Sequence, residues 1–451
     1  MKNRINLSPI IIFAIFFMVM TLIQFSTVDL PDNDGFYHIK MAWLMRTEGL
    51  KPNFSWLPLT ILNPREFYDH HFLFHVALIP FTFGDLVLGA KWAAIFFASL
   101  AFLAVWYLFE RQKINYSWLW SLAILGISEA FIYRMSIPRA QSLSLGVLAL
   151  GLSWMLDGKY FRLLLLSFLY VWLYDAFPLI MALAVLYVVA AVICEQRLDL
   201  RPIIYVGLGL LLGMLVNPYF PFNIIFAYRH LFPKLIDATA ISVGNEWYPY
   251  STGQLLSNSF PSLIFFCSGI FAVGYSGRKM DLRTTLSLLS CLLFGAMLMQ
   301  ARRFVEYFPP FVLIFSTFAW QPILQNLPSK YSHPTGLEEN NQHHSWSIFF
   351  KELIKSPVQQ LPAFPIKNLR LLSFLCLFLV ILTGISITIP LAQKSIRDSK
   401  SHQLYAGASA WLEQNTPSDA RVFQTDWDDF PRLFFFNTHN TYIVGLDPTY
   451  L

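Results

Sequence analysis

Long apolar runs separated by short polar segments dominate this sequence. A helix needs about twenty apolar residues to cross a bilayer. The candidate membrane helices cover 7–27, 86–109, 116–131, 141–156, 162–174, 178–194, 203–217, 259–274, 284–300, 309–322 and 369–390. The pattern therefore predicts an all-α polytopic membrane protein with about eleven transmembrane helices.

The basic loops between these runs predict the orientation of the chain. Cytoplasmic loops are enriched in Lys and Arg. With the N-terminus inside, all the short basic loops lie inside, together with the longer basic loop 323–368. These short loops are 110–113, 157–162, 196–201 and 277–283. The agreement requires that segment 71–84, too short to span, stays at the surface as a re-entrant or juxtamembrane helix. We expect a multi-pass protein of the cell (inner) membrane, with a cytoplasmic N-terminus and an extracytoplasmic C-terminus.

This topology divides the chain into two parts. A transmembrane domain covers 1–391, with a first outer loop at 28–85 and an inner linker at 323–368. The segment 392–451 forms a short extracytoplasmic tail, in which 421–444 reads as the start of an α/β unit. Some sixty residues are marginal for an independent core. We therefore expect the tail either to pack on the membrane part or to be the truncated remnant of a longer domain.

Composition supports the membrane assignment and excludes several functions. The chain is 56% hydrophobic and 13% charged, whereas soluble domains contain about 25% charged residues. The net charge of +5 fits basic cytoplasmic loops and does not indicate nucleic-acid binding. The four cysteines lie in or beside apolar runs without metal-ligand spacing, so we interpret them as small hydrophobic residues. No P-loop, dinucleotide fingerprint, zinc spacing or nucleophile elbow is present.

The acidic motif Asp32-Asn33-Asp34 follows the first apolar run directly. Carboxylates two positions apart can share a hard cation such as Mg²⁺ or Mn²⁺, or one of them can act as a general base. We interpret Asp32 and Asp34 as catalytic residues, with Tyr37 and His38 as substrate-binding neighbours. The alternative is a helix-capping loop, because a helix-like run begins at Asp34 and ends at Gly49.

A second polar group occurs late in the same loop, just before segment 71–84. Here Asp69 and His70 stand among further acidic and histidine residues. We expect both side chains to face substrate and Asp69 to be a second metal ligand beside Asp34. The alternative is an ordinary polar helix entry.

Arginines at two later outer turns break the positive-inside pattern. Arg134 and Arg139 lie in the turn 132–140, and Arg302 and Arg303 lie in the turn 299–309. Fixed cations of this kind suit a phosphate or pyrophosphate, so all four are candidates for binding a donor phosphate. Lipid headgroup contact is the alternative. An ion pair between Arg302 and Glu306, four residues apart, is also expected and would leave Arg303 free for an anion.

Three further outer or membrane-edge positions carry acids. Glu246 lies in the outer loop 218–258, and Asp175 lies at a membrane edge, where charge is costly. In the tail, Trp427 and Asp428 belong to an acidic group around a tryptophan. Glu246, Trp427 and Asp428 are candidates for binding substrate, and a surface turn is the alternative for the tail group.

Together these features resemble the GT-C membrane glycosyltransferases, which take sugars from polyprenyl-phosphate or polyprenyl-pyrophosphate carriers. The run 32–38 (Asp-Asn-Asp-Gly-Phe-Tyr-His) looks like the acidic motif of the first outer loop in oligosaccharyltransferase subunits, where the acid serves as metal ligand or base. Arg134 falls where that family often has an arginine, although Ala140 and Gln141 replace the acid that usually follows. The tail run 425–429 matches the Trp-Trp-Asp-Tyr-Gly acceptor motif only as Trp-Asp.

The resemblance implies an enzyme that moves a sugar, with inversion, from a lipid-linked donor to a glycan, lipid or protein acceptor at the outer face. Its other partners are membrane lipids, and Mg²⁺ or Mn²⁺ is the implied cofactor. The alternative functions are a membrane transporter or flippase and a non-catalytic glycan-assembly protein. Transporters place charges at mid-membrane in broken helices with internal repeats, whereas here the charges lie at helix ends and no repeat is evident.

Overall fold

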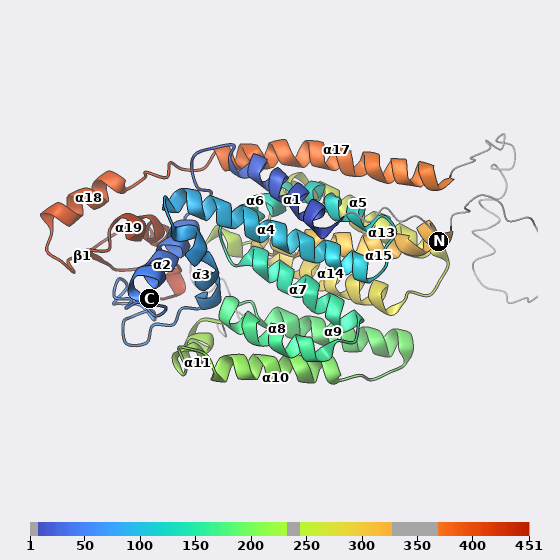
Figure 1. Cartoon of the computed structure of the whole chain (residues 1–451), viewed down its shortest axis with the longest axis horizontal. Coiled ribbons are helices and arrows are strands. Elements are labelled where there is room, and N and C mark those ends of the chain that lie inside the picture. The colour runs from blue at the N-terminus through green and yellow to red at the C-terminus, as the bar shows by residue number, and fades with distance from the viewer. Residues whose placement is uncertain (1–7, 232–243, 327–368, 451) are drawn as a thin grey trace, which may run out of the picture.

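The computed structural model describes residues 8–231, 244–326 and 369–450 and is a long bundle of helices (Figure 1). Most of the predicted linker 323–368 lies outside the described residues. The α-helices are α1 (Pro9–Gln24), α2 (Asp34–Glu48), α3 (Phe72–Leu78), α4 (Leu86–Arg111), α5 (Ser117–Leu122), α6 (Glu129–Met135), α7 (Gln141–Leu156), α8 (Tyr160–Leu173), α9 (Pro178–Glu195), α10 (Arg201–Leu215), α11 (Phe222–Phe226), α13 (Thr252–Ser276), α14 (Leu282–Gln300), α15 (Phe308–Asn326), α17 (Leu369–Arg397), α18 (Ala406–Asn415) and α19 (Phe430–Phe436). Two short strands, β1 (Arg421–Val422) and β2 (Thr441–Tyr442), pair in parallel.

The apolar runs form membrane-type helices. Within the described ranges, five helices are long and apolar enough to cross a membrane: α4, α9, α13, α14 and the part of α17 from Leu372. Shorter apolar helices, among them α1, α7, α8 and α10, complete the bundle. The prediction of a helical, multi-pass membrane protein is confirmed at this level, because each predicted run is largely helical.

Some predicted helix boundaries differ from those in the structure. The run 116–131 is broken because Ser128 is extended and its side chain caps α6, accepting a hydrogen bond from the Phe131 amide. Helix α13 begins at Thr252, where Ser251 and Gln254 form a capping box, and the predicted start at 259 coincides with a kink at Ser259, whose backbone is non-helical. The segment 71–84 yields only α3 and the short 3₁₀ helix η1 (Ile79–Thr82), which pack against α2.

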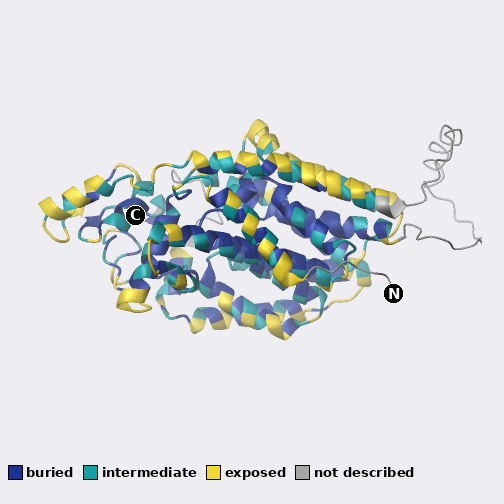
Figure 2. Cartoon of the chain, turned by 45° about the horizontal axis from the view of Figure 1, so that its top comes forward, coloured by how far each residue is buried: buried dark blue, intermediate teal, exposed yellow. Residues whose placement is uncertain are grey.

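Apolar side chains face outward along the flank of the bundle. Figure 2 shows exposed residues running along α17 and α10, among them Leu379, Val380, Leu208 and Leu211. The interior is formed by helices that pack on one another, such as α4 with α7 and α13 with α15. An apolar outer surface around an apolar interior is what a lipid-facing bundle requires.

The tail packs on the first predicted outer loop at one end of the bundle (Figure 1). The Tyr442 amide donates to the Trp56 carbonyl at 2.8 Å, and the Trp56 indole Nε1 donates to the Thr438 carbonyl at 2.9 Å. Helix α19 lies against α2, where Phe434 and Tyr37 share an aromatic cluster. The tail and the loop therefore form one packed unit that covers the start of α2.

Candidate active site

The acidic motif is held at the first turn of α2. Asp34 is the first residue of that helix, and Asp32 adopts a left-handed backbone with φ of 66°, a conformation that Asp tolerates better than most residues. Gly35 lies so close to Pro138 that a Cβ there would come within 2.5 Å of the proline ring. This close approach brings the turn 132–140 directly onto the acidic motif.

Arg139, the residue after Pro138, joins the two acids. Its Nη2 lies 2.8 Å from Oδ2 of Asp32 and 2.5 Å from Oδ2 of Asp34. Arg139 is buried, with 8% of its surface exposed, whereas the Asp34 side chain keeps 28% of its surface exposed. One guanidinium therefore neutralises both carboxylates and leaves Asp34 reachable.

Glu246 lies among three arginines. Its Oε2 is 3.0 Å from Nη1 of Arg134 and 3.3 Å from Nη1 of Arg139, and its Oε1 is 3.4 Å from Nη1 of Arg303. Burial acts to raise the pKa of the Glu246 carboxyl, but the arginines together hold that pKa well below its usual range. The three arginines thus favour a negatively charged group at the position of the Glu246 carboxylate.

Glu306 pairs with Arg134, and the predicted ion pair between Arg302 and Glu306 is wrong. Nε of Arg134 donates to Oε1 of Glu306 at 2.6 Å. Arg302 instead donates to the carbonyls of Tyr248 and Pro249 at 3.2 and 3.0 Å, because the 3₁₀ helix η5 (Arg302–Glu306) turns its side chain away from Glu306. Arg302 therefore anchors the loop that carries Glu246.

The prediction of a free Arg303 is also wrong. Besides Glu246, its guanidinium contacts the hydroxyl of Tyr174, with Nη2 donating at 3.0 Å, and lies 4.2 Å above the ring centre of Trp247. We call Asp32, Asp34, Arg134, Arg139, Glu246, Arg303 and Glu306 the acid–arginine cluster. All four predicted outer segments contribute to it.

The tail reaches the same cluster through Asn33. The side-chain amide nitrogen Nδ2 of Asn33 donates to Oδ2 of Asp428 at 2.6 Å. Its side-chain oxygen Oδ1 accepts from Nε of Arg432 at 2.6 Å. Trp427 lies next to Gly244, just before Glu246. Sequence reasoning missed Asn33 and Arg432. The available signal was a charged residue inside the otherwise apolar run 430–436.

The surroundings of Asp34 adjust its proton affinity. Burial raises the pKa of the Asp34 carboxyl to about 7, and the acids Asp32, Glu246 and Asp428 act in the same direction. Arg139 opposes them. Burial likewise raises the pKa of Asp428 to about 6, with Asp32 adding to the effect. A carboxyl with a pKa of about 7 can take up or release a proton near neutral pH.

Asp69 belongs to a separate, buried hydrogen-bonded chain. Its Oδ2 lies 2.7 Å from Nδ1 of His75, and Nε2 of His75 lies 2.8 Å from Nδ1 of His38. Since His38 is one helical turn after Asp34, the chain ends beside the cluster. The sequence analysis missed His75, although a lone histidine in the apolar run 72–82 was a signal. His70 stacks on Phe226 instead, with ring centres 5.0 Å apart.

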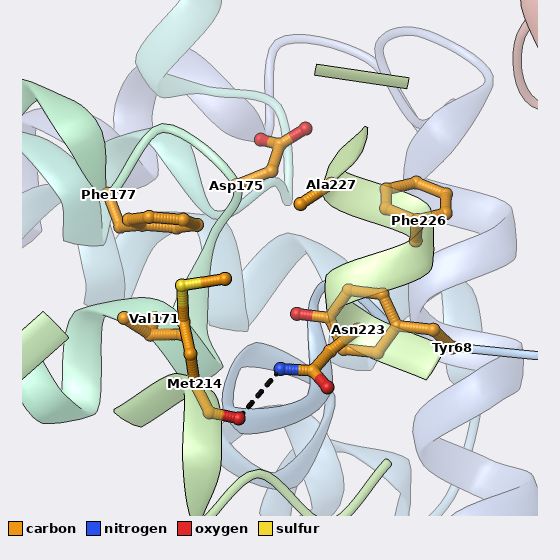
Figure 3. Close-up of a pocket in the computed structure, with 8 residues that line it drawn as sticks. All are labelled: Tyr68, Val171, Asp175, Phe177, Met214, Asn223, Phe226 and Ala227. Carbon is orange, nitrogen blue, oxygen red and sulfur yellow. Dashed lines mark hydrogen bonds between the residues drawn. The ribbon is translucent and has the colours of Figure 1, made fainter. Parts of the chain in front are cut away.

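Tyr37 is part of the packed core and is 2% exposed. A small cavity of about 20 Å³, enough for about one water molecule, lies between α8, α11 and the first outer loop (Figure 3). Asp175 lines it, next to Tyr174, which accepts the hydrogen bond from Arg303. Its other lining residues are Tyr68, Val171, Phe177, Met214, Asn223, Phe226 and Ala227. This largely apolar pocket with a few polar groups adjoins the Arg303 side of the cluster.

Comparison with known proteins identifies the fold. No protein-family model matches the sequence, and no curated protein matches it by sequence. Solved structures do match. The oligosaccharyltransferase of Archaeoglobus fulgidus superposes with a TM-score of 0.66 at 12% identity, over 97% of this chain and 64% of that one. ArnT from Cupriavidus metallidurans, bound to undecaprenyl phosphate, matches with a TM-score of 0.56 at 14% identity, over 95% and 85% of the two chains.

The chain has the GT-C fold. The arabinofuranosyltransferase AftD from Mycobacteria also matches, with a TM-score of 0.53 at 13% identity, over 98% of this chain and 32% of that one. The chain thus spans about two thirds of the archaeal enzyme, 64% of its length. That archaeal enzyme has also been solved with an inhibitory peptide and dolichol-phosphate, and with Zn and sulfate. The resemblance predicted from the sequence is confirmed at the level of the fold.

Proposed function

We propose that this protein is a membrane glycosyltransferase that moves a sugar from a polyprenyl-phosphate or polyprenyl-pyrophosphate donor to an acceptor at the outer face of the membrane. The observation that carries the proposal is the acid–arginine cluster. Acids and arginines from four segments that are far apart in the sequence meet at one end of a GT-C bundle. Undecaprenyl phosphate in ArnT and dolichol-phosphate in the archaeal enzyme support a lipid-phosphate donor.

Arg303 and Arg134 are the residues that bind the donor phosphate in this proposal. Both contact Glu246, so a phosphate group that displaces its carboxylate would meet the same donors. Trp247 and Tyr174 fix the plane of the Arg303 guanidinium. Charge neutralisation of this kind stabilises the phosphate as it leaves.

Asp34 is the base in this proposal. An acceptor hydroxyl or amide attacks the anomeric carbon, the bond from that carbon to the phosphate oxygen breaks, and configuration inverts. The acceptor proton passes to the carboxylate of Asp34, and the electron pair leaves with the phosphate between the arginines. Asp32 and Arg139 orient Asp34, because Arg139 contacts both carboxylates. A base whose pKa lies near 7 suits this task.

Mass spectrometry of membrane glycolipids and glycoproteins tests the proposal. Cells that lack the gene should accumulate a lipid-linked sugar, and wild-type protein should clear it. Asp34→Asn and Arg303→Ala should not, whereas the matched control Asp281→Asn, at the opposite end of the bundle, should clear it as well as wild type. Clearance by both cluster variants would contradict the proposal. Solute uptake into proteoliposomes without any glycan product would instead favour a transporter.

A further inference from the structure

The position between Asp32 and Asp34 is already taken by a cation from the chain itself. A single nitrogen, Nη2 of Arg139, contacts Oδ2 of both acids at 2.8 and 2.5 Å. From this geometry we infer that the guanidinium of Arg139 replaces the divalent cation that the fold implies, so that this protein acts without a metal at its acidic motif. The inference rests on the proposed function for its catalytic part, and on geometry alone for its binding part.

A bridging metal ion would have to displace Arg139 from the two oxygens. Mg²⁺ binds oxygen ligands at about 2.0–2.1 Å and requires near-octahedral geometry. An ion bound by both Oδ2 atoms would compete with Nη2 of Arg139 for the same two oxygens, and its charge would repel the guanidinium. The backbone of Arg139 is held beside the acids, because Pro138 is packed against Gly35 and the Arg139 backbone amide donates to the Ile137 carbonyl at 2.8 Å.

Other candidate ligands near the motif are also engaged. Within residues 8–231, 244–326 and 369–450, no group of three His, Cys, Asp or Glu side chains could hold a metal ion. Asp69, the predicted second ligand, contacts His75 through Oδ2 and accepts from the His71 amide through Oδ1 at 3.0 Å. Glu246 and Glu306 both pair with Arg134. The predicted metal site at Asp34 and Asp69 therefore does not fit the donor set.

A guanidinium performs part of the work of a metal ion. It is charged at all relevant pH values and presents its donors in a fixed plane. It can therefore hold two carboxylates in register and prevent their mutual repulsion from displacing the base. Removing Arg139 should have a specific consequence, which is that the acid pair becomes able to bind a divalent ion.

Manganese binding to the purified full-length protein, followed by electron paramagnetic resonance, tests this inference directly. Wild type should bind no Mn²⁺ whose signal depends on Asp34, whereas Arg139→Ala should bind about one ion per chain. The double variant Arg139→Ala/Asp34→Asn should lose that ion again, which separates this site from adventitious binding elsewhere. Mn²⁺ bound stoichiometrically by wild type and lost in Asp34→Asn would overturn the inference, and so would a folded Arg139→Ala variant that binds none.

Turnover by wild type provides the second arm. A strong chelator should change its rate of sugar transfer by less than twofold, and a rate abolished by chelator and restored by Mg²⁺ or Mn²⁺ would overturn the inference. If Arg139→Ala fails to fold, as judged by its elution and thermal unfolding in detergent, the wild-type measurements decide. Failure of the proposed function would appear as absent transfer, and the manganese result would still stand or fall by itself.

Discussion

The two ends of the bundle use ion pairs in different ways. At the end opposite the acid–arginine cluster, Arg201 pairs with Asp199 only two residues away, and the two side chains are 60% and 4% exposed. Arg283 pairs with Asp281 at the same separation. At the cluster end, Arg134 pairs with Glu306 across 172 residues of sequence, and the two side chains are 13% and 2% exposed.

Under the proposed function, this difference separates charges that orient the protein in the membrane from charges that take part in the reaction. Exposed local pairs contribute little to stability and serve mainly to keep basic loops on one side. Buried charges from distant segments carry a desolvation cost. Clusters of buried charges occur most often at functional sites, where the charges are needed for binding or catalysis.

The largest expected effect is on catalysis at the cluster end. Asp34→Asn keeps the size of the side chain but removes the proton acceptor, so sugar transfer should fall by about 10³-fold. The rate is measured as lipid-linked sugar consumed by purified protein in detergent. An unchanged rate with an intact fold would contradict the role of Asp34. Asp281→Asn is the matched control at the opposite end.

The second effect is on stability. Glu306→Gln removes a buried partner of Arg134, and loss of such a partner typically costs about 3 kcal/mol of unfolding free energy. The measurement is thermal unfolding in detergent. The control is Glu195→Gln, whose ion pair with Arg197 is exposed. If Glu306→Gln lowers the unfolding temperature no more than this control does, the ion pairs of the cluster do not differ in energy from those at the opposite end.

The third effect is on the pH profile. The pKa of Asp34 is raised to about 7, so the carboxylate form required for a base decreases below that pH. Transfer should therefore be about fivefold slower at pH 6 than at pH 7 and should level off above pH 8. A profile of kcat/KM that stays flat from pH 5.5 to 8.5 would exclude Asp34 as the titrating base.

The smallest effect is expected at the opposite end. Asp281→Asn removes the partner of Arg283 but keeps an amide oxygen that can still cap α14. Unfolding free energy should change by less than about 1 kcal/mol, with transfer unchanged. A larger loss of unfolding free energy would mean that these pairs stabilise the bundle as much as the cluster does, and the contrast between the two ends would disappear.

The sequence predicted the helical runs well, because they depend on local pattern. Apolar length gives a membrane helix directly, and the run from Asp34 to Gly49 forms α2 as expected. The break at Ser128 escaped prediction because it depends partly on contacts with Asn258 and Ser259, about 130 residues away.

Pairing within the cluster could not be read from the sequence. Spacing suggested that Arg302 would meet Glu306, but the fold offers Glu306 a better-buried partner in Arg134 and turns Arg302 toward the Tyr248 carbonyl. Spacing of four residues favours a pair only on a regular helix, and this turn is a 3₁₀ helix. Which charge meets which is therefore decided by tertiary packing.

The bond between Asn33 and Arg432 sets an order for biogenesis. The two residues are 399 positions apart, so a ribosome that has just delivered the acidic motif to the membrane needs tens of seconds, at about 5–20 residues per second, to deliver its partner. Until then the motif lacks the contacts of Asp428 and Arg432. The nascent chain thus inserts nearly all its helices before the acid–arginine cluster can gain its contacts with the tail.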